Sequence, residues 1–122
     1  MILVDTSIWI DHLCGAEPAL VSLLNAGHVL MHPFVIGEMA CGNLRNRTAA
    51  LSLMQELPVA PVATDEEALM YIARHGLIGK GIGYIDVHLL AAVSLAGTAQ
   101  LWTRDKRLGE IAKTMRLAFT AQ

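Results

Sequence analysis

The chain has 122 residues, of which 54% are hydrophobic and 16% are charged, and its formal net charge is −2. This length predicts one domain that buries about two thirds of its unfolded surface, and a charge so close to zero neither requires nor excludes a polyanionic partner. No apolar run reaches the roughly 18 residues that a membrane span needs, and the first residues lack the basic start of a signal peptide, so we expect a cytoplasmic protein that does not contact a membrane.

The two cysteines and the surplus of apolar residues lead to two expectations about burial. Cys14 and Cys41 form no motif with metal-ligand spacing, so we predict small buried thiols of a reducing compartment rather than a disulfide. The apolar surplus, which includes Ile8, Trp9 and Leu13, predicts a surface that a second copy or another partner covers.

Strands and helices are predicted to alternate along the whole chain. Pro61 would place the third strand at a sheet edge, and Thr64 with Glu67 has the spacing of a capping box. The pattern predicts one domain over residues 1–122 with an α/β fold, in which helices flank a mostly parallel central sheet of about five strands in three layers. The predicted strands are 1–4, 28–31, 59–62, 99–103 and 115–119, and the predicted helices are 6–13, 17–24, 33–42, 48–57, 64–75, 84–97 and 106–114.

Three carboxylates each stand as the only formal charge of an apolar segment. They are Asp5 after the first strand, Glu38 in the third helix and Asp86 near the start of the sixth helix. An ionised carboxylate in such surroundings is costly unless it is paired, bound to a metal or turned towards water. A fourth acid, Asp105, directly follows the strand at 99–103.

These four acids can converge at one edge of the predicted sheet, because parallel strands end at the same edge. Two carboxylates about 4 Å apart repel by about 4 kcal/mol even at an effective dielectric constant of 20, so the cluster requires protonation or a bound cation. Ligands that are all oxygen favour Mg²⁺ or Mn²⁺ over zinc. Such a site suits phosphodiester hydrolysis by an activated water.

Four short motifs carry a resemblance to a known family. Through these motifs the chain resembles the PIN-domain ribonucleases over nearly its whole length. Among the PIN-domain ribonucleases it is most similar to the VapC-type toxins of type II toxin–antitoxin pairs. The motifs are Asp-Thr-Ser at 5–7, Gly-Glu-Met-Ala-Cys-Gly at 37–42, Tyr-Ile-Asp-Val-His-Leu-Leu-Ala-Ala at 84–92 and Leu-Trp-Thr-Arg-Asp at 101–105.

The resemblance implies an endoribonuclease that uses Mg²⁺ or Mn²⁺, is often dimeric and is inhibited by a cognate VapB-type antitoxin. It implies that the acidic site consists of Asp5, Glu38, Asp86 and Asp105, and that hydroxyls at Thr6, Ser7 and Thr103 orient the acids or water. Basic residues that flank the site in sequence are candidates to hold RNA phosphates; they are Arg45, Arg47, Lys80, Arg104, Lys106 and Arg107.

Simpler interpretations stand beside these. Asp5 can be a helix cap, Asp86 a first-turn acid favoured by the helix dipole, and Asp105 a solvated surface charge. We expect His88 to be a structural histidine with satisfied hydrogen bonds, Trp9 and Trp102 to serve packing or an interface, and Met31, Met39, Met54 and Met70 to fill the core.

Three alternative functions stand beside the nuclease. A catalytically idle PIN domain could act as a binding module, although none of its acids is missing. A phosphoacceptor receiver domain would want an acceptor Asp after the third strand and a Lys after the last, and the chain has neither. A DNA nuclease of the flap-endonuclease type would need further helices to hold duplex DNA, and a chain of 122 residues has no room for them.

Overall fold

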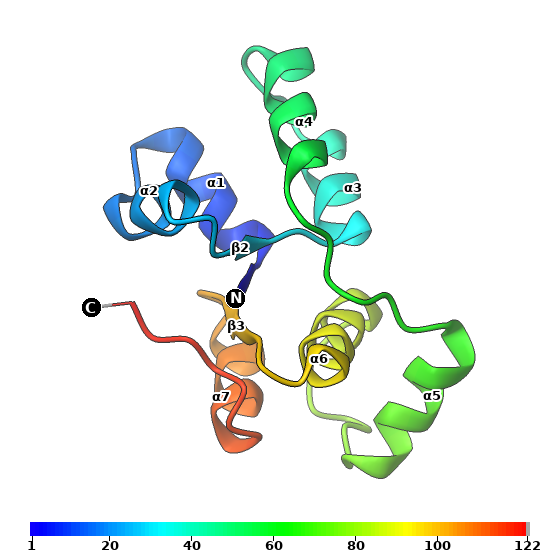
Figure 1. Ribbon diagram of the computed structural model, residues 1–122. Helices are drawn as coiled ribbons and strands as arrows, with labels where there is room; N and C mark the ends of the chain where they lie inside the picture. Colours follow the sequence, from blue (N-terminus) through cyan, green and yellow to red (C-terminus); the bar gives the residue numbers. More distant parts are fainter. Residues whose placement is uncertain (122) are drawn as a thin grey trace.

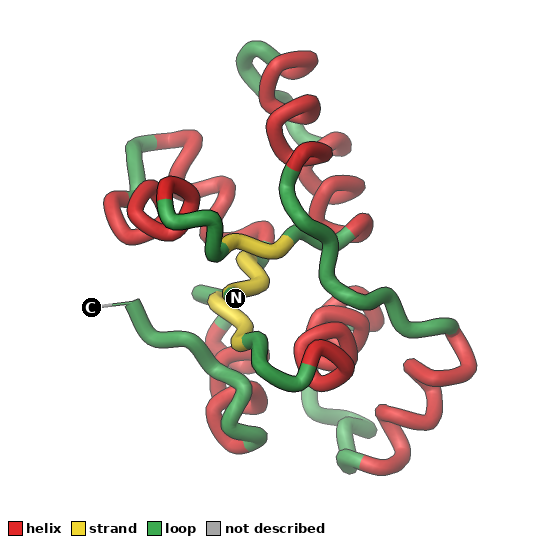
Figure 2. Tube along the Cα trace, viewed as in Figure 1, coloured by secondary structure: helices red, strands yellow, loops and turns green. Residues whose placement is uncertain are grey.

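A parallel sheet of order β2-β1-β3 forms the centre of the computed structural model, which describes residues 1–121. Helices surround the sheet (Figure 1), and the strands are short beside them (Figure 2). In chain order the elements are β1 (Ile2–Val4), α1 (Thr6–Cys14), α2 (Pro18–Asn25), β2 (Val29–Leu30), α3 (Pro33–Cys41), α4 (Arg47–Glu56), α5 (Asp65–Arg74), α6 (Tyr84–Ala96), β3 (Gln100–Trp102) and α7 (Lys106–Thr114).

β1 is the central strand, and Leu3 in its middle is paired with Leu30 of β2 and Leu101 of β3. Both pairings are parallel and all residues of β1 are buried, as expected for an apolar strand enclosed on both faces. The predicted α/β fold with a parallel sheet flanked by helices is therefore confirmed.

The predicted third and fifth strands are wrong as strands, since each contributes only an isolated parallel bridge. Val59 pairs with Met31 beyond β2, and Ala118 pairs with Leu101 of β3. Pro61 has no N–H to extend the first of these edges, and Arg116 has a left-handed φ of 60° just before the second. The sheet thus has three full strands with one bridge at each edge, where five strands were expected.

The helix predictions are confirmed to within one residue at every end. α5 begins with the predicted capping box, in which the Thr64 side chain accepts from the Glu67 N–H at 3.1 Å and the Glu67 carboxylate accepts from the Thr64 N–H at 2.9 Å. α3 begins with Pro33, whose missing N–H would be unpaired at that position anyway. Local sequence signals therefore fix most of the helix ends.

α6 is the most buried helix, because its residues 87–93 are all buried. A helix that is apolar all round must be covered on every side. It packs against β3 and against α5, and α5 lies at the periphery of the molecule in Figure 1. No helix within residues 1–121 is long and apolar enough to cross a membrane.

Several predictions of burial are wrong. Cys14 and Cys41 are free as expected but exposed, and Met70, which was predicted to fill the core, is 61% exposed. Leu13 is 49% exposed, in agreement with a surface that a partner could cover. Ile8 is buried in the chain's own core together with Trp9 and Trp102, which confirms packing roles for both tryptophans, and Met31, Met39 and Met54 are buried as predicted. Of the three residues named for a surface that a partner covers, only Leu13 is therefore accessible.

Candidate active site

Asp5 lies where β1 ends and α1 begins, and its side chain is almost fully hydrogen-bonded. Its backbone N–H donates to the Trp102 carbonyl at 2.9 Å, which holds the ends of β1 and β3 side by side. Its Oδ1 accepts from the Thr6 N–H at 2.7 Å, and its Oδ2 accepts from the hydroxyls of Thr103 at 2.6 Å and Ser7 at 3.0 Å. The residue is only 6% exposed. Asp5 is thus both a helix cap and a carboxylate of fixed orientation.

Asp105 lies two residues beyond Thr103 at the neighbouring strand end. It is the N-cap of α7, where its Oδ1 accepts from the Leu108 N–H at 2.9 Å. Its own backbone N–H donates to Thr103 Oγ1 at 3.0 Å. The Thr103 hydroxyl therefore links Asp5 to Asp105, and Asp105 is more than the solvated surface charge of the simpler interpretation.

Glu38 approaches the same strand ends from α3. Its Oε1 accepts a hydrogen bond from the Thr6 hydroxyl at 2.8 Å. Val35 and Met39 on the same helix are buried in the core, while Glu38 itself is exposed. The helix therefore packs through its apolar residues and presents its only charge at the start of α1.

Asp86 is the third residue of α6 and is half-buried. Burial raises the pKa of its carboxyl, and the negative charges of Asp5, Asp105 and Glu38 raise it further, while a hydrogen bond from the Gly83 N–H at 3.3 Å opposes them. Four separate elements therefore bring the four predicted acids close enough together that three act electrostatically on the fourth.

The described residues do not form a closed metal cage. Within residues 1–121, no group of three or more His, Cys, Asp or Glu side chains is placed to hold one ion directly. Mg²⁺ usually keeps several of its waters and binds through one or two carboxylates, so the donor set fits that ion. In Asp5, Oδ2 already accepts two hydrogen bonds, whereas Oδ1 accepts one and keeps a lone pair for a cation or water.

The predicted RNA-binding residues have different surroundings. Arg104 forms ion pairs with Asp11 of α1 and with Glu17 just before α2, and its Cζ lies 6.0 Å from the centre of the Trp102 ring. Arg107 packs against Gly81, where a Cβ would collide with it. Arg47 donates to the Gly42 carbonyl at 3.3 Å. Four of the six basic side chains have no hydrogen bond or ion pair within residues 1–121: Arg45, Lys80, Lys106 and Arg107.

A cluster of aromatic rings that includes His88 of α6 was not predicted. Its members are His32, Phe34, Tyr84 and His88. His88 is buried, but neither ring nitrogen has a hydrogen-bond partner among the described residues, so the expected satisfied histidine is wrong. Its Nε2 lies 3.8 Å from Oδ1 of Asp65, which also accepts the Tyr84 hydroxyl at 2.8 Å. Burial and the charge of His88 lower the pKa of His32 to about 4. The sequence signal for this cluster was a histidine within the apolar run of α6.

The family of the chain follows from comparison with known proteins. The PIN domain family model matches residues 2–114. The chain therefore belongs to the PIN domain family, as its four motifs indicated.

Two similar proteins of known name indicate which class of PIN-domain protein the chain resembles. The chain is 48% identical over 108 residues to Ribonuclease VapC32 of Mycobacterium tuberculosis, in both strain CDC 1551 and strain ATCC 25618. Each match covers 88% of this chain and 87% of the relative. The resemblance to VapC-type PIN ribonucleases is confirmed, and the receiver-domain alternative is dropped.

Proposed function

We propose that this chain is an endoribonuclease that hydrolyses RNA phosphodiester bonds at the cluster of Asp5, Glu38, Asp86 and Asp105, as the toxin of a VapBC-type pair. The observation that carries the proposal is the gathering of these acids at one edge of the sheet. The Thr103 hydroxyl hydrogen-bonds to both Asp5 and Asp105, and Thr6 binds Asp5 through its N–H and Glu38 through its hydroxyl. Carboxylates that repel one another without a structural benefit are rare in proteins unless they have a functional role. The printed name of the relatives, a ribonuclease, points to the same chemistry.

We propose Mg²⁺ or Mn²⁺ as the cofactor. Asp5, Glu38, Asp86 and Asp105 would hold one or two such ions, directly or through water. The bound cation would supply a nucleophilic water at neutral pH and would offset negative charge on the leaving oxygen.

The chain's own residues would prepare the acids for this role. The hydroxyls of Ser7 and Thr103 fix the Asp5 carboxylate, and the Thr6 hydroxyl holds Glu38. Such supporting contacts commonly matter almost as much as the ligands themselves. Arg45, Lys80 and Lys106, whose side chains are not engaged within residues 1–121, would hold RNA phosphates.

The other three predicted RNA-binding residues already have contacts within the chain. Arg47 and Arg107 would contact RNA from positions already fixed by Gly42 and Gly81. Arg104 would have to leave Asp11 and Glu17 in order to do so. We propose that a VapB-type antitoxin inhibits the chain, that two copies associate, and that the protein acts on RNA in the cytoplasm.

Cleavage of a mixed cellular RNA pool by the purified, antitoxin-free chain tests the proposal. We expect discrete fragments with Mg²⁺ or Mn²⁺ and none with EDTA. Asp5→Asn and Glu38→Gln should abolish cleavage, whereas Glu110→Gln, which neutralises an exposed acid of α7 outside the cluster, should not.

The idle binding module is the alternative outcome. A folded wild-type chain that leaves the RNA intact with either metal would contradict nuclease activity and favour that module. Cleavage that persists in Asp5→Asn would contradict the assigned site even if the activity is real.

A further inference from the structure

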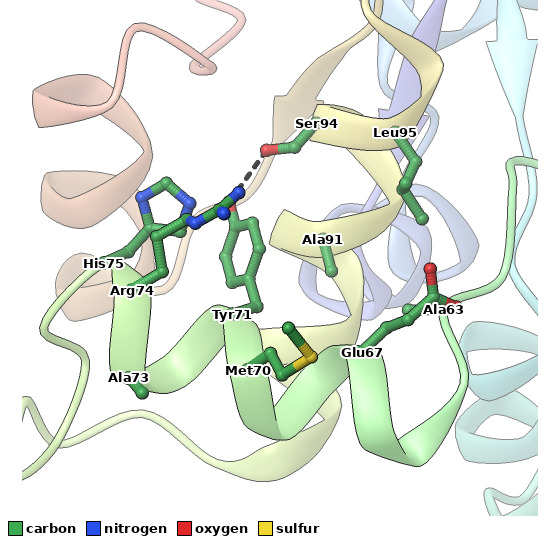
Figure 3. A pocket seen from close by; sticks show the side chains of 10 residues that line it. All are labelled: Ala63, Glu67, Met70, Tyr71, Ala73, Arg74, His75, Ala91, Ser94 and Leu95. Carbon is green, nitrogen blue, oxygen red and sulfur yellow. Dashed lines mark hydrogen bonds between the residues drawn. The ribbon is translucent and has the colours of Figure 1, made fainter.

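The loop over residues 76–83, which joins α5 to α6, is held firmly at both ends. α5 and α6 share a hydrogen bond in which the Tyr71 hydroxyl lies 2.8 Å from Oγ of Ser94 (Figure 3). Within the loop, Leu77 is buried and Ile82 packs against the core. The loop therefore has one position relative to both helices, although three of its glycines have a positive φ.

Gly81 of this loop has the side chain of Arg107 folded over its backbone. A Cβ added at Gly81 would lie 2.9 Å from Cδ and 3.0 Å from Cζ of Arg107, and it would collide with the guanidinium nitrogen Nη1. At Gly79, whose φ of 70° is close to the 80° of Gly81, an added Cβ would meet nothing within 4 Å. The backbone conformation favours glycine at both positions, but only at Gly81 does a neighbouring side chain need the space as well.

Arg107 brings to this loop a positive charge that has no acidic partner within residues 1–121. It stands with Lys106 in the first turn of α7, where the helix dipole disfavours a cation. Lys80, which precedes Gly81 in sequence, is also unpaired in the described part of the chain. Cations that gather without a benefit to the fold are typical of a surface that binds a polyanion.

We propose that Gly81 is a positioning residue, whose missing side chain lets the Arg107 guanidinium lie over the loop so that Arg107 and Lys80 hold one phosphate group of an RNA strand. A guanidinium can donate two parallel hydrogen bonds to a phosphate, and its packing on the loop orients it before the RNA binds.

The position suits a strand that passes the acidic cluster. Gly81 lies five residues before Asp86, and Arg107 lies two residues after Asp105. The contact between Gly81 and Arg107 therefore joins the two segments that carry these acids. The inference rests on the proposed function, and it adds to that function the residue that orients one of the RNA contacts.

Fluorescence anisotropy with a labelled single-stranded RNA of mixed sequence tests the inference, at low salt and in EDTA so that the strand stays intact. Gly81→Ala should weaken binding about five- to tenfold. Arg107→Met, which removes the charge and keeps a long side chain, should weaken it equally. Gly79→Ala is the matched control, because it adds the same methyl group at nearly the same φ without touching Arg107, and it should leave binding unchanged.

The salt dependence separates the loss of a phosphate contact from a change in loop shape. The slope of log Kd against log salt concentration should fall by about 0.7 in Gly81→Ala and in Arg107→Met, because one phosphate fewer is neutralised. The double variant should bind no more weakly than Arg107→Met alone, because Gly81 acts through Arg107. In the cleavage assay with Mg²⁺, Gly81→Ala should raise KM and leave kcat close to that of the wild type.

Circular dichroism melting checks that the fold is kept. Gly81→Ala and Gly79→Ala should have nearly the same Tm, because both place a side chain at a positive φ and the far end of Arg107 can move aside. If Gly81→Ala does not fold, Arg107→Met decides, and wild-type affinity and salt slope in that variant would overturn the inference.

Three further results would overturn it. They are equal binding by Gly81→Ala and Gly79→Ala, a weaker affinity with an unchanged salt slope, and losses that add up in the double variant. In each of these cases the wild type still binds and cleaves RNA, so the proposed function stands. A wild-type chain that neither binds nor cleaves RNA contradicts the proposed function itself, and the inference with it.

Discussion

The Thr103 hydroxyl forms hydrogen bonds with both strand-end acids, and its removal should be costly. It donates to Asp5 Oδ2 at 2.6 Å and accepts from the Asp105 N–H at 3.0 Å. Thr103→Val replaces the hydroxyl with a methyl group of nearly the same size, so it removes both hydrogen bonds without opening a cavity. Thr103→Ser keeps the hydroxyl and is the matched control.

The expected loss can be worked from these contacts. A hydrogen bond to a charged group contributes about 1.5–3 kcal/mol, and the nearly buried Asp5 carboxylate cannot readily replace the lost donor with water. The exposed Asp105 can recover its bond from solvent. For a chain of 122 residues, unfolding entropy of about 2.1 cal/mol/K per residue converts that loss into a decrease in Tm of roughly 6–12 °C.

Differential scanning calorimetry in EDTA measures this decrease without any contribution from a bound cation. Thr103→Val should melt lower by that amount and Thr103→Ser by less than half of it. With the metal present, the valine variant should also bind Mn²⁺ about 10- to 100-fold more weakly, because Asp5 loses a supporting contact. A Tm within two or three degrees of wild type, or equal losses in both variants, would refute the role of the hydroxyl.

Other predictions concern the pH, ionic and metal dependence of stability. The pKa of His32 is about 4 in the folded chain, below its ordinary value of 6.5. Because the unfolded state therefore binds the proton first, the free energy of unfolding should fall by about 2 kcal/mol between about pH 7 and pH 5. His32→Asn, which can still cap α3, should lose less in urea denaturation at the same two pH values, and an unchanged slope would contradict the assignment. Arg104→Ala removes the partly exposed ion pairs with Asp11 and Glu17. It should lower the free energy of unfolding by about 1 kcal/mol at low salt and by less at high salt. A loss that does not depend on salt would show that Arg104 acts through packing instead. Saturating Mg²⁺ should raise the Tm of the wild type, because binding at a hundredfold excess over Kd adds about 2.7 kcal/mol to the free energy of unfolding. Asp86→Asn should reduce that rise in Tm. An equal rise in both proteins would place the ion elsewhere.

The supporting contacts also change the expectation for Asp5. From the sequence, relief of repulsion predicts that the metal-free Asp5→Asn variant is at least as stable as the wild type. The structure adds three hydrogen bonds to that carboxylate, and the amide nitrogen of Asn cannot accept two of them. We therefore expect a moderately lower Tm, so a decrease in Tm alone does not distinguish a structural Asp5 from a catalytic one.

The sequence by itself determined the features that depend on near neighbours along the chain. Proline at a first helical turn, the capping box at Thr64 and the apolar run of α6 fix most of the helix ends. The family motifs named the four acids, and three of them, Asp5, Glu38 and Asp86, also stand out as the only formal charge of an apolar segment.

Only the tertiary structure decided the features that depend on residues far apart in sequence. Thr103 and Asp5 are 98 residues apart, and Arg104 is 93 residues from the carboxylate of Asp11 that binds it. Burial is of the same kind: Met31 and Met70 are the same residue type, yet one is enclosed by the sheet and the other is exposed. Local propensity carries no information about which face a helix turns to its neighbours, because packing of the whole chain makes that choice.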